Sequence, residues 1–399
     1  MVDILVIGGG FAGAWSAAAA ARMREETGAD LSIALIAPGD DLVIRPRLYE
    51  ADPHEMRVPL SRFLAPIDVP HVRATVSGID TAGRIVTTVD EDGRTNTFAY
   101  RRLVLASGSR LRRAEVPGAE HLHNVDTLEG AVALDAHLRG LPEGPGSRTA
   151  VVVGAGFTGL EVATELVGRL AALGNGAEPP RVVLVERSET IGPDLGPGPR
   201  PAITAALAEL GIEVRLGQSV ASVEPGAVLL TDGTRLAAGT VIWTAGVQAS
   251  PLTADIPGER DHLGRLAVDG YLKVPTAPEV YAAGDTAAAF AEPDQRVLQS
   301  CQHAIPLGKF AGHNAAADLL GLEQAVFSPA PYATCVDLGA AGAVLTSGWE
   351  RTVEATGDQA KQRKMTTNRE RIYPPLDDAA EILRVADFRV GVRASGARI

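Results

Sequence analysis

Short apolar runs alternate with helical patterns along most of the chain. The first run, residues 4–7, leads into a glycine-rich turn at 8–13 and then into an Ala-rich segment over 12–24. A second run, 150–153, leads into another glycine turn and a segment over 160–170 whose apolar residues share one helical face. Buried strands that alternate with helices predict βαβ units in a parallel sheet, so the expected fold class is α/β.

Both glycine turns have the spacing G-x-G-x-x-G, between a strand and a helix. The first glycine allows a tight turn, the second lets the backbone approach a pyrophosphate, and the third lets the helix pack against the strand. The pyrophosphate then binds the unpaired N–H groups at the helix N-terminus. The sequence therefore predicts two dinucleotide sites, with glycines Gly8, Gly10, Gly13, Gly154, Gly156 and Gly159.

An acidic residue at the tip of the next strand normally bonds the ribose of an adenine nucleotide. In the second copy this residue is Glu186, after the strand at 181–185. A carboxylate there repels a 2′-phosphate, which favours NADH over NADPH. In the first copy the strand ends at Ala37, so Asp40 or Asp41 in the following turn are the available substitutes.

The order of elements in the first half recurs in the second. Residues 71–80 predict a strand and 84–100 a hairpin with an Asp-Gly turn; a separate buried strand is expected at 103–109. The second half has its own Asp-Gly hairpin at 227–236 and a buried strand at 241–246. This repetition indicates two copies of one nucleotide-binding domain.

We therefore expect two Rossmann-like dinucleotide-binding domains, the second inserted in the first, and a C-terminal interface domain. A strand at 280–283 completes the first sheet, and Asp285 follows it at the edge where α/β sheets bind ligands; a helix N-cap is a compatible role. The predicted boundaries are 1–112 and 248–325 for the first domain, 113–247 for the second and 326–399 for the C-terminal region, which covers the cofactor or makes a dimer.

A helix is also expected after residue 300. Pro306 fits its first position or a kink in a helix begun near Gln302. In either case the helix N-terminus faces the cofactor, where its dipole stabilises negative charge. Arg45 is either a ligand of phosphate or flavin, or a solvated side chain.

Composition narrows the class of protein. The formal net charge of −12 argues against nucleic acids and anionic lipid surfaces as partners. The two cysteines, Cys301 and Cys335, are too few for a disulfide framework, so a reducing cytoplasm fits. They are not the close pair that disulfide reductases use, and small buried side chains are the better interpretation. The sequence has no signal peptide, no apolar stretch of the ~20 residues that a membrane helix needs and no metal-ligand spacing.

The motifs VIGGGFAG, LVLASGS, VVVGAGFTGLE, VIWTAGV and VYAAGDTA follow one another along the chain. In this order they resemble the two-dinucleotide-domain flavoprotein reductases over almost the full length. The resemblance implies FAD in the first domain, NADH in the inserted domain, and contact of Gly284 and Asp285 with the FAD ribityl and pyrophosphate. The expected cofactor-binding residues are Gly8, Gly10, Phe11, Ala12, Gly13, Arg45, Ala106, Ser107, Gly108, Gly154, Gly156, Phe157, Thr158, Gly159, Glu186, Ala245, Gly246, Gly284, Asp285, Gln302, His303 and Ala304.

Within that superfamily the chain is most similar to the type II NADH dehydrogenases. Glu161 falls on their acidic residue near the nicotinamide, and Gln302 on the first Gln of their quinone-site motif. The resemblance therefore implies Glu161 and Gln302 as catalytic residues. Pro306 replaces the second Gln of that motif, and the long amphipathic membrane anchor of the family is not expected. A solvated Glu161 and a packed or capping His303 are the structural alternatives.

The expected activity is transfer of a hydride from NADH to the flavin and of two electrons to an acceptor. The first hypothesis is an NADH:quinone reductase that is cytoplasmic or peripheral at the inner face of the cell membrane. A homodimer is compatible with this hypothesis. The second is an NAD(P)H reductase of a ferredoxin- or rubredoxin-type protein. The third is a flavin-binding sensor or interaction protein with little turnover.

Overall fold

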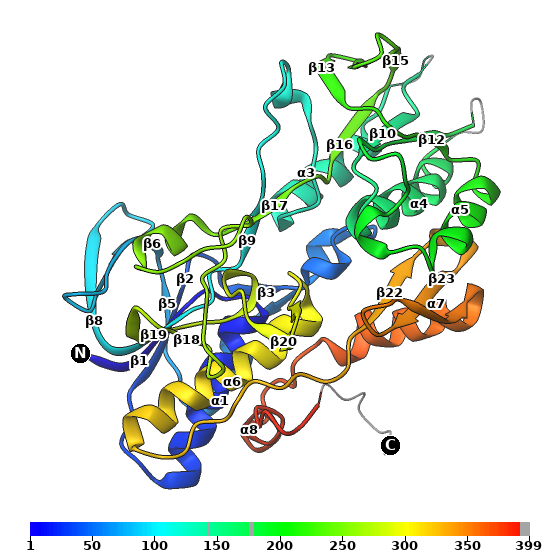
Figure 1. Cartoon of the computed structure of the whole chain (residues 1–399). Helices are drawn as coiled ribbons and strands as arrows, with labels where there is room; N and C mark the ends of the chain where they lie inside the picture. The colour runs from blue at the N-terminus through cyan, green and yellow to red at the C-terminus, as the bar shows by residue number, and fades with distance from the viewer. Residues whose placement is uncertain (143, 145, 175–178, 392–399) are drawn as a thin grey trace.

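The computed structural model describes residues 1–142, 144, 146–174 and 179–391 (Figure 1). It has a mixed α/β fold, as the sequence predicts. The first sheet has the order β18-β19-β8-β1-β2-β5, in which β1, β2, β5, β8 and β19 run parallel. Its strands are β1 (Val2–Ile7), β2 (Ile33–Ala37), β5 (His71–Arg73), β8 (Thr95–Leu105), β18 (Lys273–Val274) and β19 (Ala277–Ala282).

Further strands and a short helix complete this part of the chain. The antiparallel pair β6–β7 extends from β8, and β3 pairs with β4 near the glycine turn. These elements are β3 (Asp41–Val43), β4 (Arg57–Pro59), α2 (Leu60–Leu64), β6 (Thr75–Asp80) and β7 (Ile85–Val89), with β20 (Phe290–Glu292) and β21 (Gln295–Arg296) forming a later hairpin.

Two long helices, α1 (Phe11–Thr27) and α6 (Cys301–Leu320), pack against each other along one face of the first sheet (Figure 1). Glycines of α6 make this contact close. A Cβ atom on Gly308 would lie 2.3 Å from the carbonyl oxygen of Ala12, and one on Gly312 would lie 2.0 Å from that of Ser16. The Ser16 hydroxyl also donates to the carbonyl oxygen of Gly308 at 3.0 Å. The two helix backbones therefore meet with no side chain between them.

The second sheet repeats the arrangement with all strands parallel, in the order β12-β11-β10-β16. A separate antiparallel sheet, β13-β14-β15, carries the second Asp-Gly turn. The elements are α3 (Leu128–Arg139), β10 (Thr149–Val153), α4 (Phe157–Ala172), β11 (Arg181–Val185), α5 (Arg200–Glu209), β12 (Glu213–Arg215), β13 (Val220–Glu224), β14 (Ala227–Leu230), β15 (Arg235–Ala237) and β16 (Thr240–Trp243).

The chain crosses between the two sheets at two places that lie side by side. The outgoing segment β9 (Ser109–Leu111) pairs antiparallel with the returning segment β17 (Val247–Ala249). One two-stranded ribbon therefore joins the two halves of the molecule (Figure 1).

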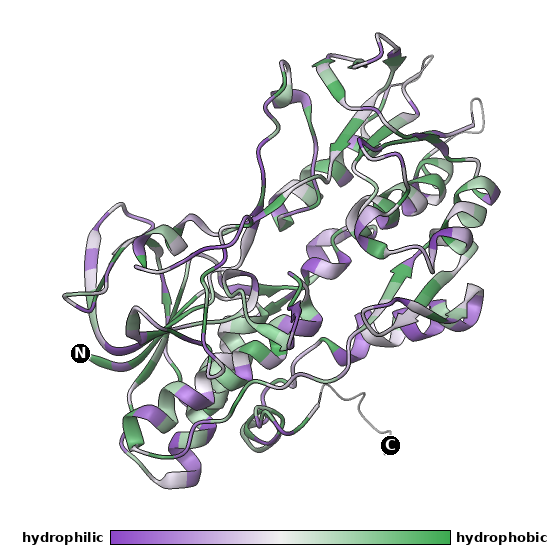
Figure 2. Ribbon diagram, in the orientation of Figure 1, coloured by the Kyte–Doolittle hydropathy of each residue, from purple (hydrophilic) through white to green (hydrophobic). Residues whose placement is uncertain are grey.

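The C-terminal region forms an antiparallel sheet with one helix against it. Strands β22 (Ala333–Asp337), β23 (Ala343–Ser347) and β24 (Thr352–Thr356) pair in that order, and α7 (Gly357–Thr366) packs on β23 and ends in a turn of π-helix. Figure 2 shows α7 largely in the hydrophilic colour. The last helix, α8 (Ala379–Val385), returns to α1. Of the C-terminal region predicted at 326–399, residues 392–399 lie outside the residues that the structure describes.

Two boundaries differ from the sequence prediction, and one open alternative is decided. The strand expected at 71–80 is divided into β5 and β6, because Ala74 lies between two pairing partners. The second hairpin strand continues into the first part of the strand expected at 103–109 as one strand, β8, which ends at Leu105. The helix α6 begins at Cys301 and holds Pro306 in its interior, so of the two positions predicted for this proline the internal one is observed.

No helix in the described ranges is long and apolar enough to cross a membrane.

The close contact of α1 and α6 predicts that Gly308→Ala destabilises the protein. The added methyl group meets backbone atoms that cannot rotate away, and overpacking of this kind costs about 1–3 kcal/mol of unfolding free energy. The matched control is Gly168→Ala, an exposed helical glycine with no atom within 4 Å of its Cβ position. Calorimetric unfolding should show a lower Tm for G308A and an equal or higher one for G168A. Equal Tm values for G308A and wild type would contradict the packing described.

Candidate active site

The first glycine turn has open space in front of a helix N-terminus. A Cβ atom on Gly13 would lie 1.8 Å from the carbonyl oxygen of Gly8, so only glycine allows α1 to start this close to β1. Gly10, by contrast, has no atom within 4 Å of its Cβ position. The backbone N–H groups at the start of α1 therefore border a space that a pyrophosphate fits.

The second glycine turn has the same geometry. A Cβ atom on Gly159 would lie 1.8 Å from the carbonyl oxygen of Gly154, and the Cβ position of Gly156 is open. Phe157, the first residue of α4, is half-buried, and Thr158 is exposed beside it. Ala245 and Gly246 follow β16, the strand that pairs with β10. The two turns thus offer two similar nucleotide cradles on two separate sheets.

The strand tips differ between the two cradles. The buried Glu186 carboxylate accepts backbone N–H groups from Ala155 at 2.7 Å and from Ser188 at 2.8 Å, which fixes it beside the second turn. In the first cradle β2 ends at the buried Ala37, as the sequence predicts. The two nearby acids form ion pairs instead: Asp40 with Arg73 at 3.3 Å and Asp41 with Arg57 at 3.1 Å.

Arg45 and Asp285 lie together beside the first cradle. The Ser109 hydroxyl donates to Asp285 at 2.6 Å and accepts a bond from Arg45 at 2.8 Å. Arg45 also pairs with Asp126, which accepts the backbone N–H of Leu111 at 2.8 Å. Arg45 is therefore not the solvated side chain of the structural alternative.

The rest of the first site is built from small residues. Ala106 is buried behind the turn, and the buried hydroxyl of Ser107 has no hydrogen-bond partner. A Cβ atom on Gly284 would lie 2.7 Å from that of Ala12 and 3.8 Å from that of Ala304. The three predicted motifs and the start of α6 therefore meet at one place. An open cradle, an unpartnered hydroxyl and a paired Arg and Asp are what an FAD diphosphate and ribityl chain require, so these residues fit FAD.

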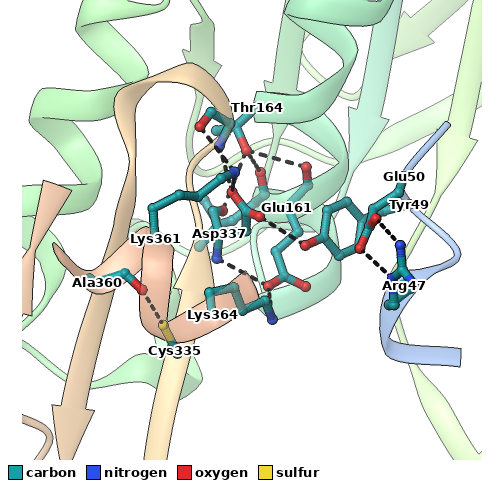
Figure 3. Close-up of polar contacts among 12 residues, drawn as sticks. Arg47, Tyr49, Glu50, Glu161, Thr164, Cys335, Asp337, Ala360, Lys361 and Lys364 are labelled. Atoms are coloured by element: carbon teal, nitrogen blue, oxygen red, sulfur yellow. Dashed lines mark hydrogen bonds and ion pairs between the residues drawn. The ribbon is translucent and has the colours of Figure 1, made fainter. Parts of the chain in front are cut away.

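Glu161 is held by a lysine that comes from the C-terminal region. It lies on α4, is 8% exposed, and pairs through Oε1 with Nζ of Lys364 at 2.7 Å (Figure 3). The same oxygen accepts the backbone N–H of Asp337 at 3.1 Å. The solvated-carboxylate alternative for Glu161 is therefore wrong.

Asp337 joins three parts of the chain at this point (Figure 3). Its carboxylate pairs with Lys361 and accepts the hydroxyl of Tyr49 at 3.0 Å. Its carbonyl oxygen accepts the hydroxyl of Thr164 at 3.4 Å. Tyr49 comes from the first sheet region, Thr164 from α4 and Lys361 from α7. We call Glu161, Asp337, Lys361, Lys364 and Tyr49 the junction cluster.

Burial governs the protonation of the junction cluster. Burial raises the pKa of the Glu161 carboxyl, and the charge of Lys364 only partly opposes this. Burial lowers the pKa of Lys364, but attraction by Glu161 outweighs it and the net pKa is raised. Burial also raises the pKa of Tyr49 well above its usual value. At the centre of the cluster, the cation Lys364 therefore lies beside the Glu161 carboxyl, which binds a proton more readily than an exposed carboxyl does.

The start of α6 is engaged by the C-terminal sheet. With its amide oriented to satisfy both atoms, Gln302 bonds the backbone N–H and C=O of Ala333. His303 is 1% exposed; its Nδ1 accepts the N–H of Leu298 at 3.2 Å, and its ring stacks on Tyr332 with centroids 5.3 Å apart. The structural alternative, a packed His303, is what the structure contains.

Both cysteines lie close enough to the junction cluster to feel its charges. Both are free and half-buried, and the charges of Glu161 and Lys364 act on both. Burial raises the pKa of Cys335 to about 11, and its thiol donates to the carbonyl oxygen of Ala360 at 3.5 Å. In the part of the chain that the structure describes, no group of three His, Cys, Asp or Glu residues is arranged to hold a metal ion.

Sequence reasoning missed the residues that the C-terminal region supplies. Lys364 and Lys361 lie in a basic stretch that gave no hint of burial, and Asp126 lies in an unremarkable loop. The available signal was the charge pattern of α7, in which lysines three residues apart share a helical face. To interpret this pattern one has to know that Asp337 of β22 and Glu161 of α4 face these lysines.

Comparison with known proteins places the chain in a known group. Residues 2–308 match the family described as pyridine nucleotide-disulphide oxidoreductase. The chain is 47% identical over 406 residues to the NADH dehydrogenase-like protein Rv1812c of Mycobacterium tuberculosis, covering 98% of this chain and 100% of that one. It is 28% identical to the type II NADH:quinone oxidoreductase Ndh of the same organism, covering 82% and 75%. Its fold matches NDH2 from Plasmodium falciparum in complex with NADH, with a TM-score of 0.76, 13% identity and coverage of 92% and 94%.

The junction cluster predicts that Lys364→Met lowers the unfolding free energy by about 3–5 kcal/mol, because Glu161 is left buried without its counter-charge. The double variant E161Q/K364M should be more stable than K364M, since no unpaired charge remains. Arg62→Met, which breaks the exposed pair with Asp377, is the control and should change little. Denaturant unfolding of the wild type, of the single variant E161Q and of these three variants tests this coupling; strictly additive losses in the double variant would count against it.

Proposed function

This chain belongs to the pyridine nucleotide-disulphide oxidoreductase family and is an NADH-dependent flavoprotein oxidoreductase that uses FAD, and we propose that its electron acceptor is a quinone. The NADH:quinone activity that names one relative supports this acceptor. The observation that carries the proposal is the buried Glu161–Lys364 pair beside the second glycine turn.

Bound FAD would accept a hydride from NADH and reduce the acceptor by two electrons. We assign the first cradle, with Arg45 and Asp285, to FAD and the second, with Glu186, to NADH. The N–H groups at the start of α1 and α4 would bind the two diphosphates, and the dipole of each helix would favour their negative charge. The boundaries proposed for the two domains and the C-terminal region remain those given by the sequence.

The proton balance gives Glu161 its proposed role. A quinone takes two electrons and two protons to become a quinol, whereas NADH delivers two electrons with one proton as hydride. One more proton must come from the protein or solvent. Because burial raises the pKa of Glu161, this carboxylate, which is paired with Lys364, is a better proton acceptor than an exposed one, and we propose that it takes up that proton and passes it on.

Gln302 has a positioning role in this proposal. Its amide is bound to Ala333, so it fastens the start of α6 to β22 and thereby shapes the place where the acceptor arrives. Pro306 follows on the same helix, where relatives of the type II group have a second Gln. We propose that the protein is cytoplasmic or peripheral at the inner face of the cell membrane. At that face it would meet quinones of the membrane.

An anaerobic titration of the purified protein with NADH tests the acceptor. NADH should remove the visible flavin absorbance, and a short-chain menaquinone analogue added afterwards should restore it within the mixing time of a rapid-kinetics experiment. Restoration by a ferredoxin- or rubredoxin-type protein and not by the quinone would replace the quinone with a protein acceptor. Slow reoxidation with every acceptor would instead favour a sensor.

The proton role predicts that Glu161→Gln slows quinol formation by at least about 100-fold, because general acid catalysis is lost. The control is Glu165→Gln, one helical turn further along α4, where burial also raises the pKa of a carboxyl. Both variants should keep a normal FAD content. Stopped-flow reoxidation of the reduced proteins by the quinone separates them, and equal rates for E161Q and E165Q would remove Glu161 from the mechanism.

A further inference from the structure

Among the residues that the structure describes, Arg351 is a buried charge without a counter-ion. The residue is 6% exposed, and its Nη1 atom has no hydrogen-bond partner. Its Nη2 atom donates to the carbonyl oxygen of Asp194 at 3.3 Å. Over the described ranges, no carboxylate forms an ion pair with this guanidinium. A buried cation without a negative partner is costly, so the arrangement calls for an anion that binds there.

The guanidinium lies beside the second nucleotide cradle. Its central carbon is 5.8 Å from the ring centroid of Phe157, the first residue of α4. Asp194, whose carbonyl it bonds, belongs to the loop that follows β11 and Glu186. Dinucleotides bind at this edge of such a sheet, between the glycine turn and the tip of the next strand.

The chain holds Arg351 in place from several sides. Its backbone has a φ of +57°, a conformation that L residues rarely adopt. A Cβ atom on Gly198 would lie 2.5 Å from the carbonyl oxygen of Arg351, so the loop packs directly on this backbone. The guanidinium lies over the Tyr332 ring at 4.4 Å, and Trp349 stacks on the same ring with centroids 4.5 Å apart. The side chain is therefore held rigid before any ligand arrives.

Two further N–H groups near this stack have no acceptor in the described part of the chain. The Trp349 Nε1 atom and the His303 Nε2 atom are buried without partners. Because His303 Nδ1 accepts a backbone N–H, Nε2 carries the proton of the neutral ring and is a donor. Burial lowers the pKa of His303 to about 4, in agreement with a neutral ring. The aromatic stack beside Arg351 therefore contains two buried N–H donors in addition to the unpartnered guanidinium nitrogen.

We propose that Arg351 binds the diphosphate of the pyridine nucleotide, so that the C-terminal region completes the NADH site. This inference rests on the proposed function for the identity of the nucleotide. The first turn of α4 has no charged side chain of its own, so the helix supplies N–H groups and Arg351 supplies the charge. A guanidinium can donate two parallel bonds to a phosphate, which an ammonium group cannot. A quinone would not need this charge, because its carbonyl oxygens are neutral.

Calorimetric titration with ADP-ribose, which has the diphosphate without the nicotinamide, tests the site independently of turnover. Arg351→Gln should raise the Kd about tenfold to a hundredfold, because a charge-assisted contact is lost. Arg351→Lys should bind with intermediate affinity, and this variant keeps the charge if the Gln variant folds poorly. The exposed Arg369 gives the matched control, Arg369→Gln, which should bind as wild type does. An unchanged Kd in R351Q would overturn the inference.

Rapid kinetics then separates the two half-reactions. In R351Q the NADH concentration for half-maximal flavin reduction should rise by the same factor, while FAD content and reoxidation of the reduced protein by the menaquinone analogue stay as in wild type. A defect confined to reoxidation would assign Arg351 to the acceptor and overturn the inference. If NADH fails to reduce the wild-type flavin, the proposed function fails, and the ADP-ribose titration still decides the role of Arg351.

Discussion

The buried charges of the junction cluster impose the constraint on which the rest of the structure depends. Glu161, Asp337 and Lys364 are each removed from water, and a charge in that position is tolerated only when its partner is present. The partners come from α4, β22 and α7, while Tyr49 adds the first sheet region. The three parts of the chain must therefore assemble together for any of these groups to be satisfied.

The C-terminal region consequently contacts both α4 and the start of α6. It fastens the start of α6 through Ala333, holds Glu161 through Lys364 and brings Arg351 to the second cradle. The two nucleotide-binding domains supply backbone N–H groups and space, which are similar in both copies. In the second copy the C-terminal region adds Lys364 and Arg351 to the acidic residues Glu161 and Glu186 of the domain itself.

The sequence predicted best what depends on local backbone geometry. Gly13 and Gly159 have no alternative at their positions, so spacing alone located both cradles, and Ala37 was correctly placed at a strand tip without an acid. Lys364 and Arg351 could not be predicted, since their roles depend on packing between residues far apart along the chain. The division of 71–80 and the continuity of β8 were missed because pairing partners, not composition, set where a strand ends.

The pairing of β8 with β19 and the packing of α1 on α6 also determine the order of folding steps during synthesis. The ribosome releases β1, α1 and β8 first, but β19 and α6 follow only after the inserted domain has emerged. The inserted sheet is contiguous in the chain and can fold early. The Ala-rich face of α1 stays exposed to solvent until Gly308 and Gly312 of α6 have been synthesised. Loop closure over so many residues slows folding, so the nascent N-terminal half is the stage most exposed to aggregation and most dependent on chaperones.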